Sequence, residues 1–229
     1  MSEFQVLTIC TGNICRSPMA AVMLRHAFGS PRVSVTSAGT SAVVGAPMTT
    51  EARAILSGLG LPDEPVHVAR QLRPELIRQA DLILGLTREH RRQIVHLEPS
   101  ATPRTFTVRE FGFVASQIGQ ADLEQAARRE AWRLDLDPSD PTSLWPIGIA
   151  AVQASKGLFP IANPEQLDVS DPYGHPIEVY AAAAARILPA VEATAAFFAD
   201  LPGRLRRSMS PASPTLKADL RALVETTAA

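Results

Sequence analysis

A stretch near the start of the chain constrains the possible folds more than any other. The segment Phe4 to Met19 reads FQVLTICTGNICRSPM, which is an apolar run, a small polar loop and a helix start. The apolar run is rich in β-branched and aliphatic residues, which favour a strand. Gly12 and Asn13 tolerate positive φ, so successive amides of the loop can turn inward. A strand, a loop and a helix in this order form a backbone cradle for an anion.

The residues around this loop carry the chemistry. Ser17 is predicted to cap the helix and Pro18 fits its first position, so the helix's positive end points at the centre of the loop. Cys10 lies at the base of the loop, where amides, the helix dipole and Arg16 stabilise a thiolate. Arg16 can also hold two oxygens of a phosphoryl group in its fork. A buried core cysteine would not need these neighbours, so we interpret Cys10 as a nucleophile.

Charge and cysteine content narrow the possible partners and the cellular compartment. The 229 residues carry 22 basic and 23 acidic side chains, which gives no global electrostatic reason to expect nucleic acid or a membrane surface as a partner. Cys10 and Cys15 are the two cysteines, which fits a reducing compartment better than a disulfide-built scaffold. No leader segment and no apolar run of membrane-spanning length is evident. We therefore expect a soluble cytoplasmic protein.

The first half of the chain alternates strands and helices. Besides the strand that ends at Cys10, strands are predicted at Val33 to Thr36, Asp81 to Leu86 and Arg104 to Val108. Helices are predicted at Pro18 to Phe28, Thr50 to Leu59, Pro74 to Gln79 and Thr87 to His96. This alternation predicts βαβ units and a mostly parallel sheet. Ligands of such sheets bind beyond the carboxyl ends of the strands, where Cys10 lies.

The second half is less regular between Phe113 and Asp168. A charged helix is predicted at Asp122 to Leu134, and the apolar segment Leu144 to Ser155 fits either a helix or a hairpin. An alanine-rich helix follows at Ile177 to Phe198, which Pro189 is expected to kink or divide. From Pro202 the tail is basic and rich in serine and proline, and Thr215 to Val224 fits a short amphipathic helix.

Four motifs, in order, resemble the low-molecular-weight protein tyrosine phosphatase family. The loop CTGNICRS resembles its Cys-x5-Arg-Ser signature, and SAGT at Ser37 to Thr40 matches the segment after its second strand. The other two are an H-x-A-R-Q stretch (His67, Ala69, Arg70 and Gln71) and a late Asp-Pro-Tyr (Asp171, Pro172 and Tyr173). The resemblance implies a three-layer α/β/α fold with a mostly parallel four-stranded sheet, phosphotyrosine phosphatase I-like. It makes residues 1–201 the phosphatase domain, with an atypical insertion at about 114–168, and residues 202–229 a basic Ser/Pro linker with a short helix.

The resemblance also implies a reaction. The expected enzyme is a phosphomonoester hydrolase, a protein tyrosine phosphatase, that forms a cysteinyl-phosphate on Cys10. Arg16 would clamp the phosphoryl group, and Asp171 would serve as general acid and then as general base. No metal and no cofactor is required. The implied phosphate-binding loop comprises Thr11, Gly12, Asn13, Ile14, Cys15 and Ser17, with Ser17 bonded to the sulfur.

Three Asp-Pro pairs compete for the role of the acid. Asp137 and Asp140 also precede prolines, and most such aspartates only cap turns. Asp171 alone is followed by a tyrosine and stands before the last long helix, so it is the predicted acid.

The pocket entrance departs from the family pattern. Val43 and Val44 stand where the family often has a bulky aromatic or polar residue, so we expect them to form the pocket wall with Tyr173. The insertion before Asp171 is well placed to act as a lid or a partner surface.

Alternatives stay open at this stage. Cys15 either fills the interior of the loop or captures an oxidised Cys10 as a reversible disulfide. His67 is interpreted as a structural hydrogen-bonding residue, and His90 shows no metal-ligand spacing. The same loop also suits a small-thiol-coupled arsenate reductase or a non-catalytic module that binds phosphoproteins. The expected partners are a phosphotyrosine protein or a small phosphomonoester, with a cognate tyrosine kinase as a further candidate.

Overall fold

Two compact units make up the computed structural model, which describes residues 3–61, 67–130, 140–161 and 163–207. The first unit comprises Met1–Phe113 and Ile161–Ala195, and the second comprises Val114–Pro160 and Ala196–Ala229. The first unit contains the sheet and all the residues of the predicted site.

A four-stranded parallel sheet is the centre of the first unit. Its strands are β1 (Phe4–Cys10), β2 (Val33–Gly39), β3 (Leu82–Gly85) and β4 (Thr105–Thr107), in the order β2-β1-β3-β4. The predicted parallel sheet is confirmed, although β2 continues past its predicted end at Thr36. The extension follows from the register, in which Cys10 pairs with Gly39 at the carboxyl end of the two strands.

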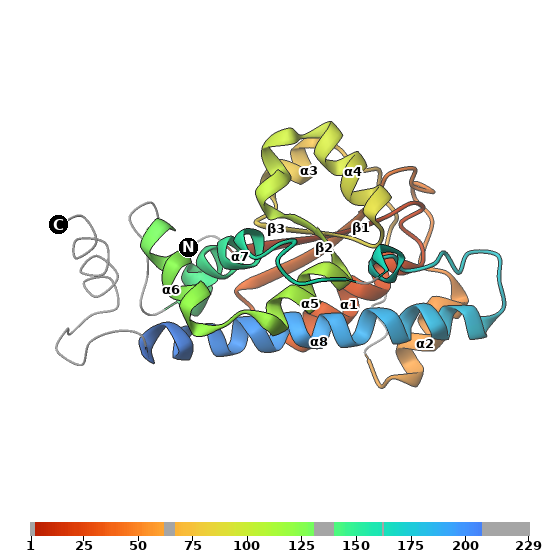
Figure 1. The fold of residues 1–229 in the computed structure, drawn as a ribbon. Coiled ribbons are helices and arrows are strands. Elements are labelled where there is room, and N and C mark those ends of the chain that lie inside the picture. The colour runs from red at the N-terminus through yellow and green to blue at the C-terminus, as the bar shows by residue number, and fades with distance from the viewer. Residues whose placement is uncertain (1–2, 62–66, 131–139, 162, 208–229) are drawn as a thin grey trace, which may run out of the picture. The chain divides into compact units, whose positions relative to one another are not determined.

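Helices cover both faces of this sheet (Figure 1). One face carries α1 (Arg16–Phe28) and the part of α8 (Ile177–Arg207) up to Ala195, and the other carries α3 (Pro74–Gln79) and α4 (Arg88–Leu97). The remaining elements of this unit are α2 (Thr50–Gly58), the start of α5 (Val108–Gln117), and the 3-10 helices η1 (Pro99–Arg104) and η4 (Pro164–Leu167). The predicted three-layer α/β/α architecture is therefore confirmed.

The carboxyl end of β2 requires a glycine. A Cβ atom on Gly39 would lie 2.3 Å from the carbonyl oxygen of Thr11. The next residue, Thr40, donates its amide to the carbonyl of Cys10 at 2.9 Å. The segment SAGT thus packs its backbone directly against the loop after β1, because no side chain stands between them.

The second unit has its own core. Its described elements are the end of α5, α6 (Gln120–Glu130), η3 (Pro141–Leu144), α7 (Trp145–Ala154) and the end of α8. Trp145 stacks on Phe198 with ring centroids 4.2 Å apart, so the segment 144–155 forms a buried helix and not a hairpin. Asp140 caps η3 by accepting from the amide of Thr142. Three predicted features lie outside the described residues: the end of the 122–134 helix, Asp137, and the tail beyond residue 207.

The longest helix, α8, runs from Ile177 to Arg207 without interruption at Pro189. By length and composition α8 is long and apolar enough to cross a membrane, contrary to the expectation that the chain has no such segment. Its buried side chains include Tyr180 and Ile187 in the first unit and Phe198 in the second. Apolar residues on α8 therefore serve the cores of both units.

Candidate active site

The loop between β1 and α1 has its carbonyl groups bonded outward. The carbonyl oxygens of Cys10, Thr11 and Gly12 accept amides from Thr40, Ser41 and Val43 at 2.9 to 3.1 Å. Those of Asn13 and Ile14 accept from the ring of His67 and the amide of Thr49. Because these carbonyl groups bond to residues outside the loop, the loop's amides can point into its interior. An anion cradle requires that arrangement.

The Cys10 sulfur lies at the floor of this loop and is almost fully buried. The amide of Asn13 donates to Sγ at 3.3 Å, and the Ser17 hydroxyl lies 2.9 Å from it. Asn13 has φ of 55°, the left-handed conformation predicted for it, and its side chain donates to Ser17 and Ser37. The Asn13 amide and the Ser17 hydroxyl are thus both within hydrogen-bond distance of the sulfur.

Ser17 does not cap α1 as predicted, but it makes the predicted contact with the Cys10 sulfur. The helix begins at Arg16, with Cys15 at the N-cap position and without a side-chain cap. Ser17 lies inside the first turn, and its hydroxyl is directed to Cys10 and Asn13. The start of α1 therefore has no side-chain cap, and the Ser17 hydroxyl contacts the Cys10 sulfur.

Arg16 is held from two sides, and its Nε is unpaired among the described residues. Its side chain is 4% exposed; Nη1 donates to the carbonyl of Val169 at 3.0 Å, and Nη2 to Asp171 at 2.6 Å. Nη2 also lies 3.3 Å from the Thr11 hydroxyl. The buried Nε has no hydrogen-bond partner among the described residues. An unpaired buried donor is costly in free energy, so this atom indicates where an anion binds.

Asp171 is positioned by the segment before it. The amide of Val169 donates to the carbonyl of Leu86 just after β3, while its own carbonyl accepts from Arg16. Asp168 accepts from the amide of Arg88 at 2.7 Å and from its guanidinium at 2.9 Å. The start of α4 and the end of β3 therefore fix the chain just ahead of the predicted acid.

His90 is a site neighbour that the sequence analysis missed. It is 3% exposed and its Nε2 lies 3.0 Å from the Thr11 hydroxyl, while Nδ1 lies 2.9 Å from Thr87. Burial, helped by the positive charge of Arg16, lowers the pKa of His90 to about 4. A neutral imidazole thus supports the outer side of the loop at pH 7.

A cavity of about 190 Å³ opens above the sulfur and brings most of the predicted residues together. Its lining includes Cys10, Thr11, Gly12, Ile14, Cys15, Arg16, Ser41, Val43, Asp171 and Tyr173. Val44 is outside this cavity and 70% exposed, so its predicted place in the wall is wrong. A tight turn explains this, because the amide of Ala46 bonds back to the carbonyl of Val43 and turns Val44 toward solvent.

Cys15 occupies the inner side of the loop next to Tyr180. Its sulfur lies 3.6 Å from the Tyr180 hydroxyl and 3.7 Å from that of Thr49. Burial raises the pKa of the Cys15 thiol. Burial also raises the pKa of Tyr180 to about 12, where the hydrogen bond with Thr49 acts against the shift and that with Cys15 adds to it. Both cysteines are free thiols in this structure.

The sheet order and a sulfur at the floor of an amide-lined loop define a phosphatase that uses a cysteine nucleophile. The model of the family named low molecular weight phosphotyrosine protein phosphatase matches residues 5–126. The chain belongs to this family, as its motifs predicted.

Curated relatives and solved structures agree with this assignment. A protein-arginine-phosphatase of Geobacillus stearothermophilus is 37% identical over 56% of this chain and 88% of its own length. A probable low molecular weight protein-tyrosine-phosphatase, EpsP, of Ralstonia solanacearum is 42% identical over 55% of this chain and 79% of its own length. The solved YwlE arginine phosphatase from Geobacillus stearothermophilus superposes with a TM-score of 0.57 at 28% identity, covering 84% of this chain and 91% of its own.

Proposed function

We propose that this phosphatase hydrolyses phosphotyrosine in proteins, with Cys10 as nucleophile, Arg16 as phosphate clamp and Asp171 as acid and base. The observation that carries the proposal is the buried Nε of Arg16, which lacks a partner among the described residues next to the Cys10 loop. A phosphoryl oxygen supplies the missing acceptor.

The entrance of the cavity supports an aryl substrate. Ile14, Val43 and Tyr173 line it with apolar and aromatic surface. Among the described residues that line the cavity, Asp171 supplies the carboxylate, and this carboxylate accepts a hydrogen bond from Arg16. An uncharged phenyl ring suits such walls better than a guanidinium group, which needs acceptors when it leaves water.

Phosphoarginine in proteins is the second candidate substrate. It is favoured by the relative named protein-arginine-phosphatase, of which this chain covers 88%. For that substrate Asp171 would have to protonate the leaving guanidine, as it would protonate the leaving phenol oxygen of phosphotyrosine.

The reaction follows from the positions of three side chains. The Cys10 thiolate attacks phosphorus, the bond from phosphorus to the phenol oxygen breaks, and the Asp171 carboxylic acid protonates that oxygen. The Asp171 carboxylate then takes a proton from water, whose oxygen attacks the cysteinyl-phosphate. This second step breaks the bond from sulfur to phosphorus, releases inorganic phosphate and regenerates the thiolate. Arg16 and the loop amides stabilise the phosphoryl oxygens in both steps.

A matched pair of peptides tests the substrate. One peptide sequence is prepared with phosphotyrosine and with phosphoarginine at the same position, and phosphate release is followed for both. We expect kcat/KM to be higher for phosphotyrosine, and Cys10→Ser to abolish turnover of both peptides. A higher kcat/KM for phosphoarginine would reject the aryl assignment but keep the phosphatase.

The partners and the compartment complete the proposal. A cytoplasmic phosphotyrosine protein is the proposed substrate, with a cognate tyrosine kinase as the enzyme that supplies it. The two buried free thiols support a reducing compartment.

A further inference from the structure

The first turn of α4 reaches the active site through a histidine. His90 is buried, and its Nδ1 lies 2.9 Å from the hydroxyl of Thr87, the residue that caps α4. Its Nε2 lies 3.0 Å from the hydroxyl of Thr11, which lines the active-site cavity. Both ring nitrogens thus have a partner, so the ring is fixed between the start of the helix and the loop after β1.

The Thr11 hydroxyl connects this histidine to the phosphate clamp. Its oxygen accepts from Nη2 of Arg16 at 3.3 Å, and the same Nη2 donates to Asp171 at 2.6 Å. A terminal guanidinium nitrogen carries two hydrogens, and two acceptors therefore match the two hydrogens of Nη2. One acceptor is a neutral hydroxyl beside a buried ring. The other is the carboxylate of a side chain that is half exposed.

A phosphoryl group that binds Arg16 needs one of these two hydrogens. The unpaired Nε of Arg16 and its Nη2 lie along the same edge of the guanidinium, and such a fork holds two oxygens of a phosphoryl group. Nη2 then has three acceptors for two hydrogens, so we expect one acceptor to leave. A phosphoryl dianion repels the Asp171 carboxylate and does not repel the Thr11 hydroxyl, so charge favours the departure of Asp171.

We propose that His90 is a positioning residue for this reaction, which keeps the Thr11 hydroxyl on Nη2 of Arg16 so that substrate binding displaces Asp171. Without that hydroxyl, the phosphoryl group would take the vacant hydrogen while Asp171 stays on the arginine, away from the leaving oxygen. The inference rests on the proposed function, because it assumes hydrolysis at Cys10 with Asp171 as the acid.

A neutral ring suits this role. Burial, helped by the positive charge of Arg16, lowers the pKa of His90 to about 4, although Asp171, Glu89 and Asp168 act in the opposite direction. At pH 7 the ring therefore holds the hydroxyl without adding a positive charge that would compete with Arg16 for the phosphoryl group.

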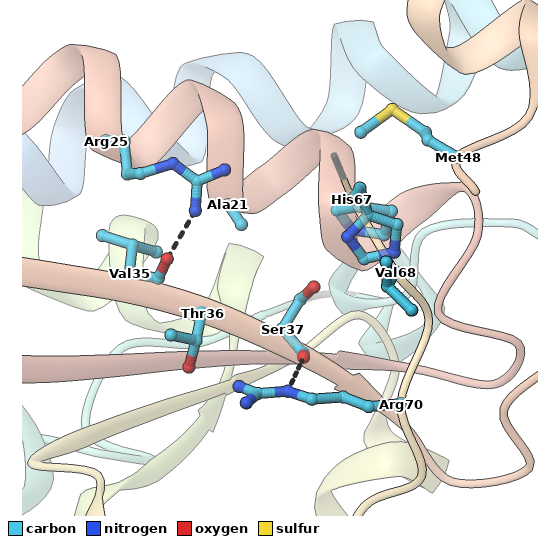
Figure 2. Close-up of a pocket in the computed structure, with 10 residues that line it drawn as sticks. Ala21, Arg25, Val35, Thr36, Ser37, Met48, His67, Val68 and Arg70 are labelled. Carbon is cyan, nitrogen blue, oxygen red and sulfur yellow. Dashed lines mark hydrogen bonds between the residues drawn. The ribbon is translucent and has the colours of Figure 1, made fainter. Parts of the chain in front are cut away.

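A second histidine contacts the same loop without contacting the clamp. The ring of His67 lies 2.6 Å from the main-chain carbonyl of Asn13, whose amide donates to the Cys10 sulfur. Figure 2 shows this ring in a separate pocket, which Arg70 also lines. His67 thus supports the backbone of the loop, whereas His90 supports a side chain that holds Arg16. Substitution of His67 therefore shows what a general loosening of the loop does.

Two variants isolate the proposed connection. Thr11→Val keeps the shape of the side chain without its hydroxyl, and His90→Asn keeps an amide near Nδ1 that does not reach Thr11. We expect each to lower kcat/KM for phenyl phosphate by about five- to twentyfold, as a partial loss of acid catalysis. The kcat/KM for 2,4-dinitrophenyl phosphate, whose leaving group needs no proton, should change by less than about twofold. The inhibition constant for inorganic phosphate should not rise, because Arg16 still binds the anion.

A double variant tests whether His90 acts through Thr11. In the Thr11→Val background, His90→Asn should cause no further loss, because the hydroxyl that the ring holds is already absent. His90→Gln, whose amide reaches the position of Nε2, should lose much less activity than His90→Asn. Thr11 is exposed, so Thr11→Val tests the connection even where His90→Asn lowers stability.

Two further variants serve as comparisons. His96→Asn, at an exposed position on the same helix, is the matched control and should leave all three constants unchanged. His67→Asn should lower kcat/KM for both aryl phosphates and raise the inhibition constant for phosphate, because it loosens the loop itself.

Three results would overturn the inference. The first is that Thr11→Val and His90→Asn leave kcat/KM for phenyl phosphate unchanged, or lower it equally for both aryl phosphates. The second is that their losses multiply in the double variant. The third is that both variants weaken phosphate inhibition as His67→Asn does.

Asp171→Asn separates this failure from a failure of the proposed function. If its loss depends on the leaving group while those of Thr11→Val and His90→Asn do not, the positioning role alone is wrong. If the loss in Asp171→Asn is also independent of the leaving group, the acid assignment is wrong and the positioning role fails with it.

Discussion

The Asp171 carboxylate lies 2.6 Å from Nη2 of Arg16, so the predicted acid and the predicted clamp form an ion pair. The arginine is buried while the aspartate side chain is 49% exposed. We expect a phosphoryl dianion that binds Arg16 to compete with Asp171 for Nη2, and so to free the carboxyl group for the leaving oxygen.

Removal of the acid should depend on the leaving group. Asp171→Asn is expected to lower kcat for a phosphotyrosine peptide by about 10²- to 10⁴-fold, because the phenol oxygen then leaves without a proton. The loss should be far smaller for 2,4-dinitrophenyl phosphate, whose leaving group needs no proton. Equal losses for the two substrates in steady-state assays would contradict the acid role.

Loosening the segment before the acid should affect turnover more than phosphate affinity. Arg88→Gln removes the ion pair with Asp168, which is partly exposed on both sides. We expect kcat to fall by about two- to fivefold, in keeping with the modest strength of such pairs. The inhibition constant for inorganic phosphate should stay the same, because Arg16 and the loop are untouched. Arg92→Gln is the control. A weaker phosphate affinity in Arg88→Gln would show that the segment before the acid affects phosphate binding as well as turnover.

The buried His90 should make folding stability depend on pH. Its pKa of about 4 lies below the ordinary value of 6.5, through burial first and Arg16 second, although Asp171, Glu89 and Asp168 act in the opposite direction. Between these two values the unfolded chain binds a proton that the folded chain excludes. Stability contributed by neutral His90 is therefore complete above pH 6.5 and is lost as the pH falls toward 4, by about 3 kcal/mol in total.

Urea unfolding of His90→Gln tests this expectation. The variant should lose less unfolding free energy than the wild type between pH 7 and pH 4.5, whatever its stability at pH 7. His96→Gln, at an exposed position on the same helix, should behave like the wild type. Parallel curves for His90→Gln and the wild type would show that His90 is not the source of the pH dependence.

A methyl group on Gly39 should disturb the loop. The new Cβ would lie 2.3 Å from the Thr11 carbonyl oxygen, so Gly39→Ala is expected to cost about 1–3 kcal/mol of unfolding free energy. Activity should fall as well, because the loop must move away. Gly58→Ala is the matched control, since a Cβ there meets nothing within 4 Å. Thermal unfolding and kcat/KM are measured for both variants. Equal changes in stability and in activity for Gly39→Ala and Gly58→Ala would refute the steric argument.

Local patterns predicted the sheet well and missed one helix that carried a visible signal. The sequence pattern predicts no helix directly after the strand at Arg104 to Val108, yet α5 follows β4 at once. Thr107 and Glu110 form a reciprocal capping box, in which the Thr107 hydroxyl accepts from the Glu110 amide and the carboxylate accepts from the Thr107 amide. The sequence Thr-x-x-Glu contains this signal, although the short strand in front of it obscured the helix start.

The site was predictable where its residues are contiguous and not where contacts are long-range. The loop from Cys10 to Arg16 carries its geometry in adjacent residues. His90 meets Thr11 across 79 positions, and no local pattern around His90 indicates that contact. Val169 acts through its backbone amide and carbonyl, so its side chain leaves no trace of that role in the sequence.

The two main-chain bonds of Val169 bear on how the family can vary. Two residues before Asp171, the backbone is joined to the end of β3 and to Arg16. Because the backbone is anchored at Val169, the position of Asp171 does not depend on the length of the chain before Val169. Sequence can thus be gained or lost between β4 and Val169 during evolution while the spacing of nucleophile, clamp and acid stays the same, which makes this stretch a tolerant place for new segments.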